Sequence, residues 1–119
     1  MAGVSAFTNL GAYVAGKAGI IGLTKVAALD YADQGIRVNV VAPGPIRTDG
    51  IIAAGERAQE LAAAAVPMRR MGETDDVSDV VLWLCSNRSR YVTGVVIPID
   101  GGQSAGDKPD QMYTGDPME

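Results

Sequence analysis

Tyr13 and Lys17 are the first pair of side chains in this chain that could do chemistry. They stand four residues apart, and on a helix this spacing puts both on one face, one turn apart. The positive charge of Lys17 favours the phenolate, so the Tyr13 phenol would lose its proton more easily than a free tyrosine. Such a pair could give a proton to, or take one from, an alcohol or ketone oxygen. A solvated Tyr–Lys pair is the more common arrangement, so this interpretation depends on residues further along the chain.

Composition limits the classes of function. The 119 residues are 47% hydrophobic and 20% charged, as in an ordinary globular domain. A net charge of −4 argues against a nucleic-acid partner, because such proteins present a basic face. The chain has no histidine, which excludes Ser-His-Asp and Cys-His triads and most zinc sites. The one cysteine, Cys85, lies in an apolar run, which predicts a buried structural thiol and no internal disulfide.

The expected location follows from the same features. A single reduced cysteine fits a cytoplasmic protein. Met1 leads into small residues without a basic start, so we expect no signal peptide. No apolar run reaches transmembrane length, so we also expect no membrane partner.

The Tyr13/Lys17 pair lies near the start of a long predicted helix, from Ala12 to about Gln34. A loop from Met1 to Gly11 precedes it, and Gly35 is a natural stop. Apolar residues occupy more than one side of this helix, which predicts burial on more than one side. Three internal glycines form a shallow face for a close neighbour, for which helix packing is favoured over a ligand. They are Gly16, Gly19 and Gly22.

Two strands and two helical stretches follow. The β-branched run from Ile36 to Ala42 predicts a strand that the Pro-Gly-Pro turn ends. An alanine-rich stretch from Ile51 to Ala65 predicts a softer helix. Thr74 is the expected N-cap of an amphipathic helix with Asp75 and Asp76 in its first turn.

The second strand and the order of the elements predict the fold class. Val95 to Ile99 reads as a strand that Pro98 places at a sheet edge. The order helix, strand, helix, strand predicts an α/β fold with a parallel sheet. Two parallel strands are not a self-sufficient core, so the chain looks like part of a domain. Residues from about 105 to 119 read as a polar tail.

Four motifs, in this order and spacing, resemble the C-terminal half of the short-chain dehydrogenases/reductases. The resemblance covers residues 2 to about 104 and implies the C-terminal portion of a doubly wound, Rossmann-like parallel sheet. This portion would be two strands with flanking helices. The motifs are Tyr13-x-x-x-Lys17 with Ala18-Gly19, the run Arg37 to Thr48, Arg70-Met71-Gly72-Glu73 before a helix, and Tyr91-Val92-Thr93-Gly94 before the strand that ends at Asp100-Gly101-Gly102.

The resemblance assigns roles to matching positions. Tyr13 would be the general acid or base at the substrate oxygen, and Lys17 would assist it and hydrogen-bond the nicotinamide ribose. NAD or NADP would carry the hydride. The Ile46 backbone would hold the carboxamide, and the Thr48 hydroxyl would bond cofactor amide or phosphate oxygens. The remaining residues expected to line the nicotinamide are Pro43 and Gly44.

The resemblance also shows what these 119 residues do not contain. The family's glycine-rich phosphate loop, its NAD-or-NADP selecting residue and its catalytic asparagine have no match here. Ser5 is off register for the catalytic serine and is more simply a loop residue. Residues that act as a unit are non-additive, so two of four would leave little turnover. The segment from Ile51 to about Met68 would be a substrate lid.

Two functions therefore stay open. The first is an NAD(P)-dependent oxidoreductase of alcohols and ketones, of which this chain is a truncated form with little activity alone. The second is a non-catalytic relative that pairs its apolar faces with itself or with a partner. The family forms dimers and tetramers through the long helix and the edge strand, so the resemblance also implies a homo-oligomer.

Overall fold

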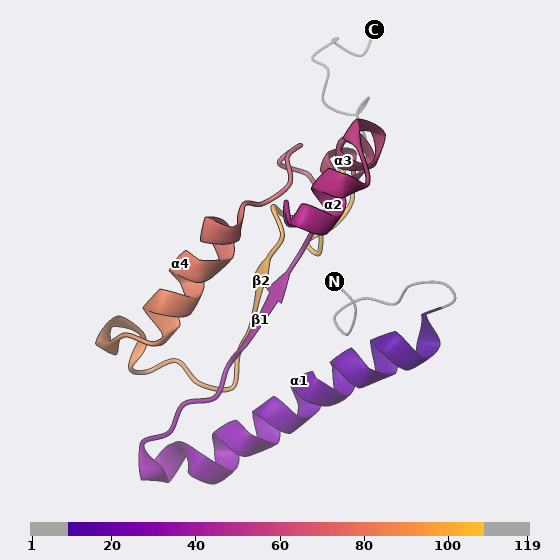
Figure 1. Ribbon diagram of the computed structural model, residues 1–119. Helices are drawn as coiled ribbons and strands as arrows, with labels where there is room; N and C mark the ends of the chain where they lie inside the picture. Colours follow the sequence, from indigo (N-terminus) through magenta and orange to yellow (C-terminus); the bar gives the residue numbers. More distant parts are fainter. Residues whose placement is uncertain (1–9, 109–119) are drawn as a thin grey trace, which may run out of the picture.

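The computed structural model describes residues 10–108, in which two parallel strands lie among helices (Figure 1). The strands pair in register from Val40 with Val96 to Pro43 with Ile99. The predicted parallel α/β arrangement is therefore confirmed. The elements are α1 (Gly11–Tyr31), the 3-10 turn η1 (Ala32–Gln34), β1 (Val40–Pro43), α2 (Asp49–Ala53), α3 (Glu56–Ala64), α4 (Thr74–Leu84), the 3-10 turn η2 (Asn87–Ser89) and β2 (Val96–Ile99).

Figure 1 shows how the helices surround the strands. The strands lie between α4 and α1, and α2 and α3 gather near the end toward which the β1 arrow points. The N-terminal end of α1 lies toward this same end of the molecule. In open α/β sheets, ligands bind beyond the carboxyl ends of the strands. The elements that carry the predicted site residues therefore lie at the end of the sheet where ligands bind in folds of this kind.

Little apolar surface is buried within the described residues. In residues 10–108 the fully buried apolar side chains are Ala28 and Val66, whereas Leu23 and Leu29 of α1 are 70% and 80% exposed. The radius of gyration is 17.2 Å, against about 13 Å for a compact domain of 100 residues. The predicted burial of the long helix on more than one side is therefore not found within residues 10–108, because the two strands are too small to cover it.

The first strand is shorter than predicted, because β1 begins at Val40 and not at Ile36. The residues before it bond mainly through their own side chains rather than in a backbone ladder. The Val38 N–H donates to Thr93 Oγ1 (3.1 Å), and Asn39 Nδ2 donates to the Val92 carbonyl (3.0 Å). These bonds satisfy the polar groups of the segment and leave only its last residues to form the sheet.

Two helix boundaries also differ from expectation. The predicted helix over residues 51–65 is two helices, α2 and α3, because Gly55 takes a left-handed φ of 96° between them. The N-cap of α4 is Glu73 rather than Thr74. The Asp76 carboxylate accepts a hydrogen bond from the Glu73 N–H (2.7 Å), which closes this helix start.

The long helix begins one residue earlier than predicted, at Gly11, and ends as expected before Gly35, whose φ is 74°. A Cβ built on any of the three internal glycines would have no atom of another segment within 4 Å. The described residues thus include no close neighbour for the predicted shallow face.

Two further expectations are wrong. Cys85 follows the last residue of α4 and is exposed, because only one face of α4 packs toward β1. The segment Gly11–Gln34 is long and apolar enough, by length and composition alone, to cross a membrane. That property is weak evidence by itself, because the core helix of a soluble protein shares it.

Candidate functional site

Tyr13 and Lys17 lie on the first two turns of α1 and contact one another. The Lys17 Nζ atom is 5.4 Å from the centroid of the Tyr13 ring, within the range of a cation–π contact. The Tyr13 side chain is 54% exposed. Within residues 10–108, neither the phenol nor the ammonium makes a hydrogen bond or an ion pair. The predicted placement on one helix face is confirmed, and both polar groups are open to a ligand.

The turn after β1 begins with a tight approach between the two strand ends. Pro43 is the last residue of β1, and the Gly44 N–H donates to the Ile99 carbonyl (2.9 Å). A Cβ at Gly44 would lie 2.7 Å from the Asp100 Cβ, closer than real Cβ atoms come. Glycine is therefore required at this position by the packing of β1 on β2.

Ile46 forms an isolated parallel bridge with Gly72. The Gly72 N–H donates to the Pro45 carbonyl (2.9 Å), and the Arg47 N–H donates to the Gly72 carbonyl (2.8 Å). In a trans peptide the N–H and C=O point in opposite directions, so the N–H and C=O of Ile46 point away from Gly72. The turn thus presents one backbone donor and one acceptor on its other side.

Thr48 follows as the N-cap of α2, in an extended conformation. Thr48 is exposed, and its side chain makes no capping hydrogen bond, so the hydroxyl is available to another group. Of the residues expected to bind cofactor, which include Tyr13 and Lys17, the other four form one continuous turn at the carboxyl end of β1. They are Pro43, Gly44, Ile46 and Thr48.

The structure gathers the predicted site residues into two groups. The turn is one group, and the pair of Tyr13 and Lys17 on α1 is the other, at the same end of the molecule (Figure 1). No hydrogen bond or ion pair joins the two groups within residues 10–108. Ser5 lies outside the described residues.

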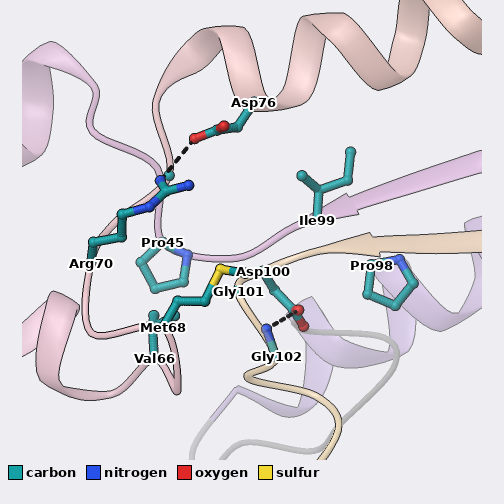
Figure 2. Close-up of a pocket in the computed structure, with 11 residues that line it drawn as sticks. Pro45, Val66, Met68, Arg70, Asp76, Pro98, Ile99, Asp100, Gly101 and Gly102 are labelled. Carbon is teal, nitrogen blue, oxygen red and sulfur yellow. Dashed lines mark hydrogen bonds and ion pairs between the residues drawn. The ribbon is translucent and has the colours of Figure 1, made fainter.

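A cavity of about 340 Å³ opens between the strand ends and the segment that follows α3 (Figure 2). Asp100 forms part of its wall. Its carboxylate accepts hydrogen bonds from the backbone N–H groups of Gly102 (3.0 Å) and Ser104 (2.9 Å). Burial raises the pKa of Asp100, but the hydrogen bonds from Ser104 and Gly102 outweigh it and leave the pKa below its usual value.

Arg70 and Asp76 lie on the opposite wall of this cavity. Arg70 Nη1 is 3.0 Å from Asp76 Oδ2, the contact drawn as a dashed line in Figure 2. The hydrogen bond from the Glu73 backbone, followed by that from Arg70, lowers the pKa of Asp76. The sequence indicated Asp76 only as a charge at a helix start. It contained no local signal for the contact with Arg70.

Arg37 is a further residue whose role was missed. Its guanidinium donates to the carbonyls of Leu84 (2.6 Å), Ser86 (3.3 Å) and Val92 (3.3 Å) and to Ser89 Oγ (3.1 Å). Positive charge near the carbonyl end of α4 is also favourable for the helix dipole. An arginine inside an apolar strand-like run is a signal that could have been used, because a partly buried guanidinium needs several acceptors.

Comparison with known proteins gives these observations a context. A family model described as enoyl-(acyl carrier protein) reductase matches residues 1–104. The 3-oxoacyl-[acyl-carrier-protein] reductase FabG of Thermotoga maritima is 49% identical over 90 residues, which are 76% of this chain and 37% of FabG. The chain thus spans little more than a third of that relative.

Two solved structures share the fold. ElxO with NADP bound has a TM-score of 0.81 and 37% identity, over 88% of this chain and 44% of ElxO. A 4-hydroxyisoleucine dehydrogenase complexed with NADH has a TM-score of 0.80 and 33% identity, over 89% of this chain and 44% of the dehydrogenase. The two strands and their helices therefore match part of a Rossmann-like sheet, and with the family model covering most of its residues, the chain belongs to the short-chain dehydrogenase/reductase family.

Proposed function

We propose that this chain carries the proton-transfer pair and the cofactor turn of an NAD(P)-dependent oxidoreductase. The enzyme would move a hydride between a nicotinamide cofactor and an alcohol or ketone. The observation that carries the proposal is the Tyr13–Lys17 contact on α1, at the same end of the molecule as the carboxyl end of β1. Family membership and relatives bound to NADP and NADH support it.

Tyr13 is the proposed proton donor or acceptor at the substrate oxygen. Its phenol is exposed on the first turn of α1, where a substrate could reach it. Lys17, beside the ring, would stabilise negative charge on the phenolate and donate to a ribose hydroxyl. The nicotinamide cofactor, when bound, supplies the hydride chemistry.

The turn from Pro43 to Thr48 has the donors and acceptors that such a cofactor needs. Ile46 offers an N–H and a C=O on the side away from Gly72, which matches the acceptor and donor of a carboxamide. Thr48 offers a hydroxyl that makes no capping bond and would donate to phosphate or amide oxygens. The segment of α2 and α3, at this end of the sheet, would exclude water when it covers the site.

The substrate is proposed only as a class. One relative is a reductase of 3-oxoacyl groups on acyl carrier protein, and another is a 4-hydroxyisoleucine dehydrogenase. Interconversion of a carbonyl and an alcohol is common to both names. The family match to residues 1–104 supports the proposed division into a Rossmann-like part and a polar tail over residues 105–119.

Titration with NADH and NADPH tests the proposal, with Trp83 and nicotinamide fluorescence as signals. We expect saturable binding of one cofactor by the purified chain. Tyr13→Phe should keep this binding but lower any turnover by about 100-fold, because the proton donor is lost. Tyr31→Phe, at the other end of α1, is the matched control and should change neither. Failure to bind either cofactor would contradict the proposal.

A second function has an observation in its favour. The apolar residues of α1 are largely exposed, so they would be buried by association with a second copy or a related subunit. In that case the chain would be a pairing module without catalysis. Light scattering on the purified chain tests this second function, and a well-folded monomer would contradict pairing.

A further inference from the structure

We infer that Asp76, on the first turn of α4, positions the cofactor turn through Gly72. The consequence for cofactor binding rests on the proposed function. The geometry rests on the contacts of residues 45–47 and 70–76, none of which belongs to the proton-transfer pair. Within residues 10–108 Asp76 makes no hydrogen bond or ion pair with the turn or with Tyr13, so it acts through the segment between them.

Gly72 is the link between this segment and the turn. Its N–H and C=O bond to Pro45 and Arg47 on either side of Ile46. A Cβ at Gly72 would lie 2.7 Å from Ile46 Cδ1, so the Ile46 side chain lies against the Gly72 backbone. The direction of the free Ile46 N–H and C=O is therefore set by the position of Gly72.

Asp76 secures the chain on both sides of Gly72. Its Oδ2 accepts hydrogen bonds from Arg70 Nη1 (3.0 Å), two residues before Gly72, and from the Glu73 N–H (2.7 Å), one residue after it. Arg70 Nη1 also donates to the Met71 carbonyl (3.1 Å). One carboxylate oxygen thus joins the residues that flank Gly72 to the start of a helix.

A second charged contact also joins this segment to the turn. Glu73 lies 3.9 Å from Arg47, which is the residue after Ile46 in the turn. This exposed ion pair is long and contributes little by itself. The charged groups around the link include Arg47, Arg70, Glu73 and Asp76, and of these Asp76 makes the short hydrogen bonds on both sides of Gly72.

Asp76→Asn and its neighbour Asp75→Asn form a matched pair of variants. Both remove one negative charge from the first turn of α4. Only Asp76 contacts Arg70 and the Glu73 N–H, whereas the side chain of Asp75 is exposed and makes no hydrogen bond or ion pair in residues 10–108. A difference between the variants therefore reports the contacts and not the charge.

The first readout is the hydrogen exchange of the Gly72 and Arg47 amides, which needs no cofactor. We expect about tenfold faster exchange in Asp76→Asn, because an uncharged amide oxygen accepts weaker hydrogen bonds from Arg70 and Glu73 and local opening then costs less, and no change in Asp75→Asn. Unchanged exchange in Asp76→Asn, or an equal increase in both variants, would overturn the inference.

The second readout is the NADPH dissociation constant of the same proteins. Asp76→Asn should raise it about three- to tenfold, because the turn must then be ordered on binding, and Asp75→Asn should not. Equal affinity in both variants would also overturn the inference. If the unmodified chain binds neither NADH nor NADPH, the proposed function has failed. The exchange contrast still shows whether Asp76 secures the turn.

Arg70→Gln keeps the test decisive if Asp76→Asn does not fold. This variant keeps the bond from Glu73 to Asp76 and removes only the guanidinium. We expect about threefold faster exchange at Gly72, with circular dichroism unchanged. Within residues 10–108 Arg57 pairs with Glu60 on α3, so Arg57→Gln is its control and should leave the exchange at Gly72 unchanged.

Discussion

Helix α1 and the segment from Arg37 to Lys108 are secured in different ways. In the segment, side chains bond to backbone groups more than fifty residues away, as Arg37 does with Val92 and Asn39 with Val95. The described part of α1 contributes one fully buried side chain, Ala28, next to Gly94. The segment from Arg37 to Lys108, the bonded region, is held by hydrogen bonds between distant residues, whereas α1 exposes an apolar surface.

This difference separates the two groups of the proposed site. The turn with Ile46 and Thr48 belongs to the bonded region, so its shape is set by contacts within the described chain. Tyr13 and Lys17 belong to α1, so their distance from the turn depends on whatever covers that helix. The chemistry of the pair is local, but its alignment with a cofactor requires the larger fold or a partner.

Removal of Arg37 should give the largest loss of stability. Arg37→Ala removes a charged donor from the buried Ser89 hydroxyl and from the carbonyls of Leu84 and Val92, and we expect a loss of about 3 kcal/mol in the free energy of unfolding. Urea denaturation followed by circular dichroism measures it. Arg57→Ala is the control and should cost less than about 0.5 kcal/mol, since its pair with Glu60 is exposed. Similar losses for both would show that the bonded region is not secured by Arg37.

Gly101→Ala should have the next largest effect. Gly101 has a φ of 60°, and a Cβ there would lie 2.5 Å from Val66 Cγ1. The strained backbone and the clash with a buried side chain should cost about 2 kcal/mol of unfolding free energy. The same denaturation measurement checks it, and a change below about 0.5 kcal/mol would contradict the packing of Val66 on the strand end.

Local signals in the sequence predicted α1 and both strand regions. Gly35 ended the helix as expected, and Val96 to Ile99 pair as a strand, because periodicity and glycine act over a few residues. The start of β1 was not predictable in this way. It depends on Asn39 and Val38 finding partners at Val92 and Thr93, more than fifty residues later.

The site residues also differ in whether they could be predicted from local signals. The helix spacing of Tyr13 and Lys17 was enough to place them on one face. The link between Asp76 and Arg70 required knowledge of the backbone path, as did the exposure of Cys85, which depends on the face that α4 packs toward β1. The split at Gly55 was predictable, because an isolated glycine in an alanine-rich stretch lowers helix propensity.

Gly19→Ala should act in the opposite direction. In α1 a Cβ at Gly19 would meet nothing within 4 Å, so the helix should gain about 0.5–1 kcal/mol of unfolding free energy from the better helix former. Denaturation of a monomeric sample measures this. A loss of stability would mean that another segment or copy packs on this face. Light scattering of the same variant would then show weaker association.

The pH dependence of Asp100 should give the smallest effect. Its folded-state pKa is lowered, so its stabilising contribution is present above the unfolded value of about 4 and is lost as the pH falls through the folded value. Asp100→Asn should therefore cost about 0.5 kcal/mol at pH 7, a small figure because the group is partly solvated, and less at pH 3, below the unfolded-state value. Denaturation of both proteins at the two pH values gives the difference directly. An equal difference at pH 7 and pH 3 would mean that the charge of Asp100 does not strengthen the hydrogen bonds from the Gly102 and Ser104 N–H groups. The bonded region would then be stabilised by uncharged contacts alone.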